Sequence, residues 1–188
     1  MQKKIIIAVT GASGSIYANA LINELQQLSE PLEEIALIFS ENGRKVWEYE
    51  LGNIEPFEKP IRVYKNSDMF SAVASGSAAY DTMIIVPCSM GTLGRISTGT
   101  SPDLICRAAD VMLKERRKLI VVPRELPYNL IHIENMRTIT LAGGIVIPAS
   151  PSFYSLPKSI DELVLTVVNR ILDIAGIKTD HYRWGDSV

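Results

Sequence analysis

Apolar and β-branched residues gather into five short runs along the chain, and each run is followed by a segment with helical spacing of apolar positions. The runs cover Lys4–Thr10, Glu34–Ser40, Thr82–Cys88, Lys118–Pro123 and Gly144–Pro148. Their length and composition predict five β-strands. Runs such as TMIIVPC are apolar on both faces, which is typical of strands covered by helices on both sides of a parallel sheet. The pattern predicts an α/β fold: one doubly wound parallel sheet in a single-domain, Rossmann-like, three-layer α/β/α architecture.

The clearest helical pattern lies near the C-terminal end. Apolar residues recur there at helical spacing, namely Ile160, Leu163, Val164, Val167, Val168 and Ile171. Ser159 and Glu162 predict a capping box at its start. The polar segment that follows contains Tyr182 and Trp184, which favour docking on the domain or on a neighbouring subunit. We therefore expect one domain over residues 1–177 and a docked tail over residues 178–188.

Composition excludes several classes of protein. The chain has 188 residues, 47% of them hydrophobic, and a formal net charge of −2, which suits one domain with a sizeable core and gives no sign of a nucleic-acid partner. No apolar run approaches the roughly 20 residues needed to span a bilayer, so we expect no membrane partner. The opening MQKKIIIAVTGASG is interpreted as a first strand, because glycines follow where a signal peptide would remain apolar. Only Cys88 and Cys106 are present, without metal-like spacing, which favours a reduced, cytoplasmic protein.

Small and hydroxylated residues follow every predicted strand. The loops are Gly11–Ser13 after the first strand, Ser40 after the second, PCSMGT after the third, PRELP after the fourth and PASPSFY after the fifth. Ligands of open α/β sheets bind at the carboxyl ends of the strands, where these loops should meet. Backbone N–H groups at the following helix starts suit a phosphate. Each loop alone could be an ordinary strand-to-helix turn, but five at one edge favour a ligand site.

The first loop favours a mononucleotide over a dinucleotide. TGASGS lacks the G-x-G-x-x-G fingerprint, and no Walker lysine follows a glycine-rich loop. We expect a phosphate near one of the helix starts and a planar ring across the neighbouring loops.

Longer segments resemble one known family almost from end to end. They are VTGASGS, ASGS at Ala74–Ser77, PCSMGTLGRISTG, RAADVMLKERRKLIVVPRELPYNLIHIENM, PASPSFYSLPKSIDELVLTVVNRILDIAGI and RWGD. Together they resemble the UbiX-type flavin prenyltransferases. The resemblance implies transfer of a dimethylallyl group from dimethylallyl monophosphate to N5 and C6 of reduced FMN, and delivery of the prenylated FMN to a UbiD-type decarboxylase. It also implies a homo-oligomer, with a dodecamer as one form. The apolar stretch Leu104–Leu113 would likewise favour a homo-oligomer.

The same resemblance implies roles for individual residues. FMN would be held by Gly11, Ala12, Ser13, Ser40, Ser89, Met90, Gly91, Thr92 and Arg124. The donor phosphate would be held by Tyr154 and Arg170, with Arg107 and Lys114, which a neighbouring subunit could supply. Ser13, Glu50 and Glu125 are the catalytic candidates. Met69 and Phe70 stand where some relatives have a tryptophan, so the prenyl pocket departs from the pattern there.

The residue types fit a metal-independent reaction on a monophosphate. The chain has no adjacent aspartate pair of the kind that recruits Mg²⁺ to a diphosphate. Arginine, lysine and tyrosine can neutralise a monophosphate directly. Structural readings remain open: Arg170 could extend its stem along an apolar face, Glu125 could pair with Arg124, Glu50 and Lys114 could be solvated helix-end charges, and Tyr154 could simply pack.

Two other functions are compatible with the sequence. One is an FMN-dependent decarboxylase of peptidyl-cysteine or phosphopantothenoylcysteine, which would need a catalytic histidine. The only histidines are His132, expected as a helix-packing residue, and His181 in the tail. Cys88 has no evident base beside it and is a weak nucleophile candidate. The other function is a passive flavin carrier, which turnover of a prenyl phosphate would distinguish from an enzyme.

Overall fold

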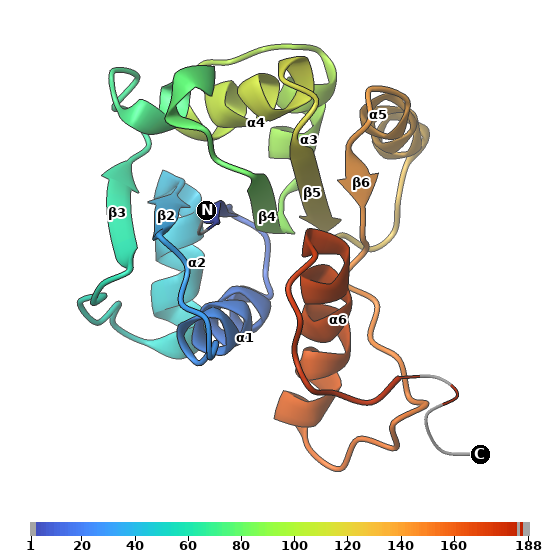
Figure 1. The fold of residues 1–188 in the computed structure, drawn as a ribbon. Coiled ribbons are helices and arrows are strands. Elements are labelled where there is room, and N and C mark those ends of the chain that lie inside the picture. The colour runs from blue at the N-terminus through green and yellow to red at the C-terminus, as the bar shows by residue number, and fades with distance from the viewer. Residues whose placement is uncertain (1–2, 184, 186–188) are drawn as a thin grey trace.

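A computed structural model describes residues 3–183 and Gly185. In these residues six parallel strands form one sheet in the order β3-β2-β1-β4-β5-β6 (Figure 1). The strands are β1 (Lys4–Val9), β2 (Glu34–Phe39), β3 (Ile61–Lys65), β4 (Thr82–Cys88), β5 (Lys118–Pro123) and β6 (Ile145–Val146). The sheet confirms the expected doubly wound, Rossmann-like fold.

Helices cover both faces of the sheet (Figure 1). One face packs against α1 (Ser15–Gln26), α2 (Glu41–Leu51) and α6 (Ile160–Ala175). The other packs against α3 (Met90–Ser97), α4 (Leu104–Lys114) and α5 (Leu130–Leu141), together with the 3-10 turns η1 (Ala72–Ala74) and η2 (Gly76–Ala78). Within β1, Ile5 and Ile7 face the first core and Ile6 and Ala8 face the second, because successive strand side chains point to opposite faces.

The sequence pattern missed β3 and overestimated β6. The strand β3 lies at the edge of the sheet and buries only Ile61 and Tyr64, so its sequence IRVYK lacks a continuous apolar run. The regular pairing of β6 with β5 is limited to Ile145 and Val146. Beyond it the chain still follows β5 through hydrogen bonds from the N–H of Ile147 to Val121 and of Ala149 to Pro123.

The capping box at the start of α6 is only half formed. Ser159 Oγ accepts a hydrogen bond from the N–H of Glu162 at 3.1 Å, as expected. The Glu162 carboxylate, however, accepts from the N–H of Lys158 at 2.6 Å instead of from Ser159. The longer reach satisfies a donor one residue before the cap, so both groups still stabilise the helix start.

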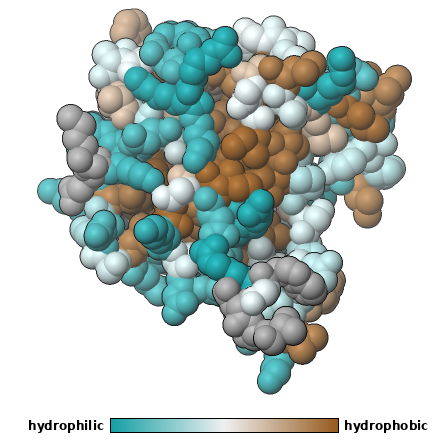
Figure 2. Space-filling view, turned by 45° about the vertical axis from the view of Figure 1, so that its right-hand side comes forward, coloured by the Kyte–Doolittle hydropathy of each residue, from teal (hydrophilic) through white to brown (hydrophobic). Residues whose placement is uncertain are grey.

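The apolar residues of Leu104–Leu113 were expected to favour a homo-oligomer, but the structure gives them another role. Most apolar residues of α4 are buried within the chain itself, among them Leu104, Ile105 and Met112. Large exposed apolar side chains lie instead on and just before α5: Leu126, Leu130, Ile131, Ile133 and Leu141. Figure 2 turns the right-hand side of the Figure 1 view forward, the side on which α5 lies, and shows hydrophobic side chains gathered there. Among the described residues, no helix combines the length and apolar character needed to cross a bilayer.

Candidate active site

The loops after β1 and β4 meet where the strand order of the sheet reverses. These strands are neighbours, and the sheet grows outward from them in both directions. Thr10 joins the two loops: its Oγ1 donates to the carbonyl of Pro87 at 2.8 Å and accepts from the N–H of Ser89 at 2.7 Å. Such a switch point is where open α/β sheets form a ligand crevice. Sequence reasoning missed Thr10, although its place directly after an apolar strand was a usable signal.

Glu50 occupies the start of α1. Its carboxylate accepts hydrogen bonds from the N–H groups of Gly14 and Ser15 at 2.8–3.1 Å. Burial raises the pKa of Glu50, but hydrogen bonds from the Ser13 hydroxyl and from these backbone N–H groups outweigh it and hold the pKa below its usual range. Glu50 is therefore ionised at neutral pH, and the same hydrogen bonds make it a weaker base than a free carboxylate. Because it occupies these N–H groups, a phosphate must bind at another helix start.

The start of α2 forms a cradle with the first loop. Ser40 caps the helix by accepting from the N–H of Gly43 at 2.9 Å. Gly11 lies so close to this turn that an added Cβ would stand 2.6 Å from Cβ of Asn42. Because Gly11 has no side chain, the Gly11–Ser13 loop can approach the start of α2. This close approach to the start of a helix suits the phosphate of a mononucleotide.

The remaining residues expected at the FMN site lie at the same edge. Ser89 caps α3 and accepts from the N–H of Thr92 at 3.3 Å, so Met90, Gly91 and Thr92 form the first turn. The N–H of Arg124 donates to the carbonyl of Cys88, which ties the end of β5 to that of β4. Burial raises the pKa of Tyr17 on α1, against the opposing charge of Arg124. The structure thus brings loops from four strands together.

Tyr154 and Arg170 line one cavity of about 340 Å³ between the 152–155 segment, α6 and the tail. The tail is held on α6 by Asp173, which contacts Nε2 of His181 at 3.3 Å and Nη2 of Arg183 at 2.9 Å. Burial raises the pKa of Asp173, but the Arg183 hydrogen bond and the His181 contact hold it below its usual range. The cavity is lined on one side by this tail. Trp184, expected to help dock the tail, lies outside the described residues.

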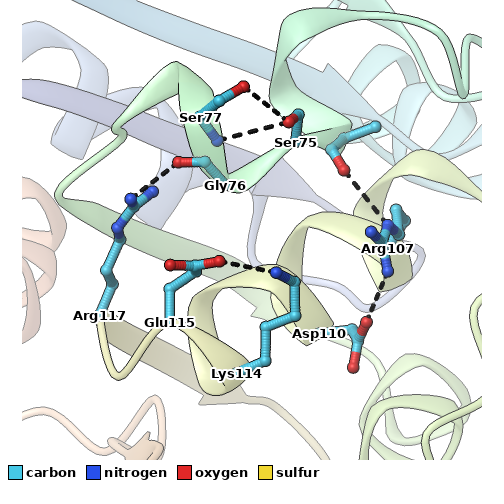
Figure 3. A network of polar contacts seen from close by, with 9 residues as sticks. Ser75, Gly76, Ser77, Arg107, Asp110, Lys114, Glu115 and Arg117 are labelled. Carbon is cyan, nitrogen blue, oxygen red and sulfur yellow. Dashed lines mark hydrogen bonds and ion pairs between the residues drawn. The ribbon is translucent and has the colours of Figure 1, made fainter.

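Arg107 and Lys114 lie apart from this cavity, because α4 and α6 cover opposite faces of the sheet. Figure 3 shows them in a separate polar network. Arg107 donates to the carbonyl of Ala74 at 3.2 Å and pairs with Asp110 at 2.8 Å. Lys114 pairs with Glu115 at 2.7 Å. One chain alone therefore does not bring these two cations to Tyr154 and Arg170.

Several other candidate residues have contacts or an exposure that the sequence did not predict. His132 packs edge-on against the ring of Tyr128, as expected of a packing residue, and it has a second role: Nδ1 accepts from the N–H of Asn129, and the two residues form the capping box of α5. Glu125 is exposed and accepts from the N–H of Leu126 at 3.0 Å. Met69 and Phe70 lie exposed in the loop after β3.

Cys88 is fully buried at the end of β4. Burial raises the pKa of its thiol to about 12. A thiol with this pKa is protonated at neutral pH, which disfavours a nucleophilic role. The described residues contain no group of three or more His, Cys, Asp or Glu side chains placed to hold a metal ion.

The fold and this edge of the sheet define a nucleotide-binding α/β protein, and comparison with known proteins makes the class specific. The flavoprotein family model matches residues 1–172. Flavin prenyltransferase UbiX of Methanocaldococcus jannaschii is 45% identical over 185 residues, covering 97% of this chain and 98% of that protein. The chain therefore belongs to the flavoprotein family and, within it, to the UbiX-type flavin prenyltransferases.

Solved structures agree with this placement. AnUbiX (PadA1), solved in complex with FMN and dimethylallyl pyrophosphate, is 38% identical, with a TM-score of 0.89 and 98% coverage of each chain. A dodecameric FMN-dependent UbiX-like decarboxylase from Escherichia coli is 36% identical, with a TM-score of 0.87, covering 96% of this chain and 98% of that chain. The family match and the first complex support FMN as the cofactor.

Proposed function

We propose that this protein transfers a dimethylallyl group from dimethylallyl monophosphate to N5 and C6 of reduced FMN, and that a UbiD-type decarboxylase uses the product. The observation that carries the proposal is the convergence of loops from β1, β2, β4 and β5 at one switch point, in a chain of this family. Reduced FMN supplies the nucleophilic ring atoms. The chain's own residues must hold the flavin and bind the leaving phosphate, and they can accept a proton.

Phosphate binding falls to the cavity of Tyr154 and Arg170. A guanidinium can form two parallel hydrogen bonds to phosphate oxygens, and it keeps its charge at all relevant pH values. Arg170 therefore neutralises the charge that the phosphate gains as the carbon–oxygen bond breaks. Tyr154 adds a neutral hydrogen-bond donor. Arg107 and Lys114 would join them only from a second copy of the chain.

The proton released from the flavin passes to the released phosphate or to a carboxylate. Glu50 is ionised and fixed by backbone donors beside the Gly11–Ser13 loop. Glu125 lies on the loop after β5, next to Arg124, and is exposed in the single chain. Ser13 donates to Glu50 and so orients it. Among the carboxylates, we assign proton transfer to Glu50 or Glu125, with Ser13 as the orienting donor.

The alternative is direct decarboxylation of peptidyl-cysteine or phosphopantothenoylcysteine, since the similar Escherichia coli structure is that of an FMN-dependent UbiX-like decarboxylase. The positions of the two histidines disfavour this alternative, because it needs a catalytic histidine in the site. His132 caps α5 and His181 contacts Asp173 in the tail, so neither follows a strand directly. Carbon dioxide release from either thiol substrate would support it.

Donor choice and metal dependence test the proposed reaction. Prenylation is compared with dimethylallyl monophosphate and with the pyrophosphate, each in the presence of excess EDTA. We expect faster turnover of the monophosphate and no effect of EDTA. Loss of activity with EDTA and its return with Mg²⁺ would contradict the proposal.

A further inference from the structure

Arg95 on α3 is a half-buried cation without a carboxylate partner in the described part of the chain. Its Nη2 donates to Thr92 Oγ1 at 3.2 Å. Its Nε is buried and has no hydrogen-bond partner among the described residues. A buried charge left unpaired costs free energy, and so does a buried donor without an acceptor. The residue therefore needs an explanation other than the stability of the single chain.

Arg95 contacts a thiol instead of a carboxylate: its guanidinium donates a hydrogen bond to the sulfur of Cys106, which also interacts with Asp103. The Arg95 side chain reaches back toward the first turn of α3, where Nη1 would lie 3.7 Å from a Cβ added at Gly91. The start of a helix carries partial positive charge, which disfavours a cation. The thiols of Cys88 and Cys106 bring no opposing charge, because burial raises their pKa values to about 12 and about 11 and keeps them neutral. This position is suited to a ligand that brings negative charge.

Arg95 also occupies one of the two acceptor sites of the Thr92 hydroxyl, which is paired with the hydroxyl of Ser89. A guanidinium can only donate, so Thr92 Oγ1 must accept from it. Thr92 Oγ1 lies 3.1 Å from Ser89 Oγ, which also accepts from the N–H of Thr92. Either hydroxyl can donate to the other. When Thr92 donates, both acceptor sites of Ser89 are occupied, and when Ser89 donates, both acceptor sites of Thr92 are occupied. In each case the hydroxyl proton of the accepting residue has no acceptor among the described residues and remains available to a ligand.

We propose that Arg95 is a positioning residue of the flavin site, which holds the Thr92 and Ser89 hydroxyls so that one of them donates toward FMN, and which favours reduced FMN by its charge. The inference rests on the FMN site assigned above. A positive charge near a flavin stabilises the electron density that reduction adds. An aligned hydroxyl donor would strengthen the binding of both redox forms.

The test separates charge, hydroxyl alignment and folding. Affinities for oxidised and reduced FMN, the midpoint potential of bound FMN and the unfolding free energy without FMN are measured for Arg95→Met, Arg95→Lys and Thr92→Val. Arg137→Met is the matched control, because Arg137 is an exposed arginine on α5 that contacts Glu134. It should behave like the natural protein in every measurement.

Arg95→Met should weaken reduced FMN about tenfold more than oxidised FMN, which corresponds to a potential about 30 mV more negative. Arg95→Lys should fall between Arg95→Met and the natural protein. Without FMN, Arg95→Met should be at least as stable as the natural protein, because it removes a half-buried charge that has no carboxylate partner and a buried Nε without an acceptor. Thr92→Val keeps the charge and should weaken both redox forms by a similar factor, about 2- to 10-fold.

An unchanged potential in Arg95→Met, or equal loss of both affinities together with lower stability, would overturn the proposal. If Arg95→Met fails to fold, unchanged FMN affinity of Thr92→Val overturns it. Failure of the natural protein to bind FMN would instead overturn the FMN site itself, and the two failures are therefore distinguishable.

Discussion

Glu50 shows how one carboxylate can serve both the fold and the site. It caps α1 through the N–H groups of Gly14 and Ser15 while standing beside the candidate flavin loop. The sequence WEYELGN identified Glu50 only as an acidic candidate at a helix end. Its partners lie 35 and 36 residues away, and no local pattern reports a contact of that kind.

Glu50→Gln should lower the free energy of unfolding by about 1 kcal/mol at pH 7, since it removes the charge from a helix cap. The pKa of Glu50 is lowered in the folded protein, so its contribution is complete above its unfolded pKa of about 4.3 and is lost as pH falls through the folded value. Urea unfolding should therefore show a difference from the natural protein that disappears in acid. Glu48→Gln, an exposed change on the same helix, is the control. A difference that persists in acid would contradict the cap.

Arg170→Ala should abolish most prenyl transfer while leaving FMN affinity nearly intact. Arg170 is exposed in the single chain, so the full effect requires that the bound reactants exclude water from it; removing a fixed charged donor then costs about 2.7–4 kcal/mol, or roughly 10²–10³ in rate. Arg170→Lys should recover part of the rate, because a point charge cannot reproduce the planar fork. Tyr154→Phe should be milder, at about 0.5–1.5 kcal/mol. Single-turnover rates and FMN affinities measured in parallel check this; equal losses in both would place Arg170 in the flavin site or the scaffold.

At the scale of elements, strands and helices with strong patterns were predicted well. The runs at Thr82–Cys88 and Lys118–Pro123 match β4 and β5 residue for residue. The edge strand β3 was missed because its exposed face gives no apolar run. The capping role of His132 was also missed, because a cap made by imidazole depends on its distance from Asn129 and not on periodicity.

The docking of the tail on α6 should depend on Asp173. Asp173→Asn weakens the contacts with His181 and Arg183, so trypsin should cleave the tail faster after Lys178 and Arg183. The lowered pKa of Asp173 means that the natural tail should also loosen as pH falls through that value. At low pH, where trypsin is inactive, an acid-stable protease is used instead, and the masses of the cleaved tail fragments are measured. Asp161→Asn, at the opposite end of α6, is the control. Equal cleavage of the natural protein and both variants would contradict a role of Asp173 in holding the tail.

At the scale of the whole molecule, the resemblance carried more than the pattern did. Periodicity alone reached a nucleotide-binding α/β domain, whereas the long collinear segments identified the family that the comparisons confirmed. The roles of individual residues remain predictions. Arg107 and Lys114 show why: their place relative to Arg170 depends on a second copy, which one sequence does not position.

The apolar surface on α5 should be an interface between copies of the chain. Leu130→Asp would place a charge in that surface, so the particle should become smaller. Size-exclusion chromatography with light scattering measures the mass. Asn23→Asp adds the same charge on the exposed side of α1 and should leave the mass unchanged. An unchanged mass for Leu130→Asp would remove α5 from the interface.

The central claim is prenyl transfer to flavin, and the mass of the flavin after reaction tests it most directly. The purified protein is incubated without oxygen with reduced FMN and dimethylallyl monophosphate, and the released flavin is analysed by mass spectrometry. We predict a flavin heavier by one dimethylallyl-derived unit, formed together with inorganic phosphate. Recovery of unmodified FMN after binding of both reactants would contradict the account.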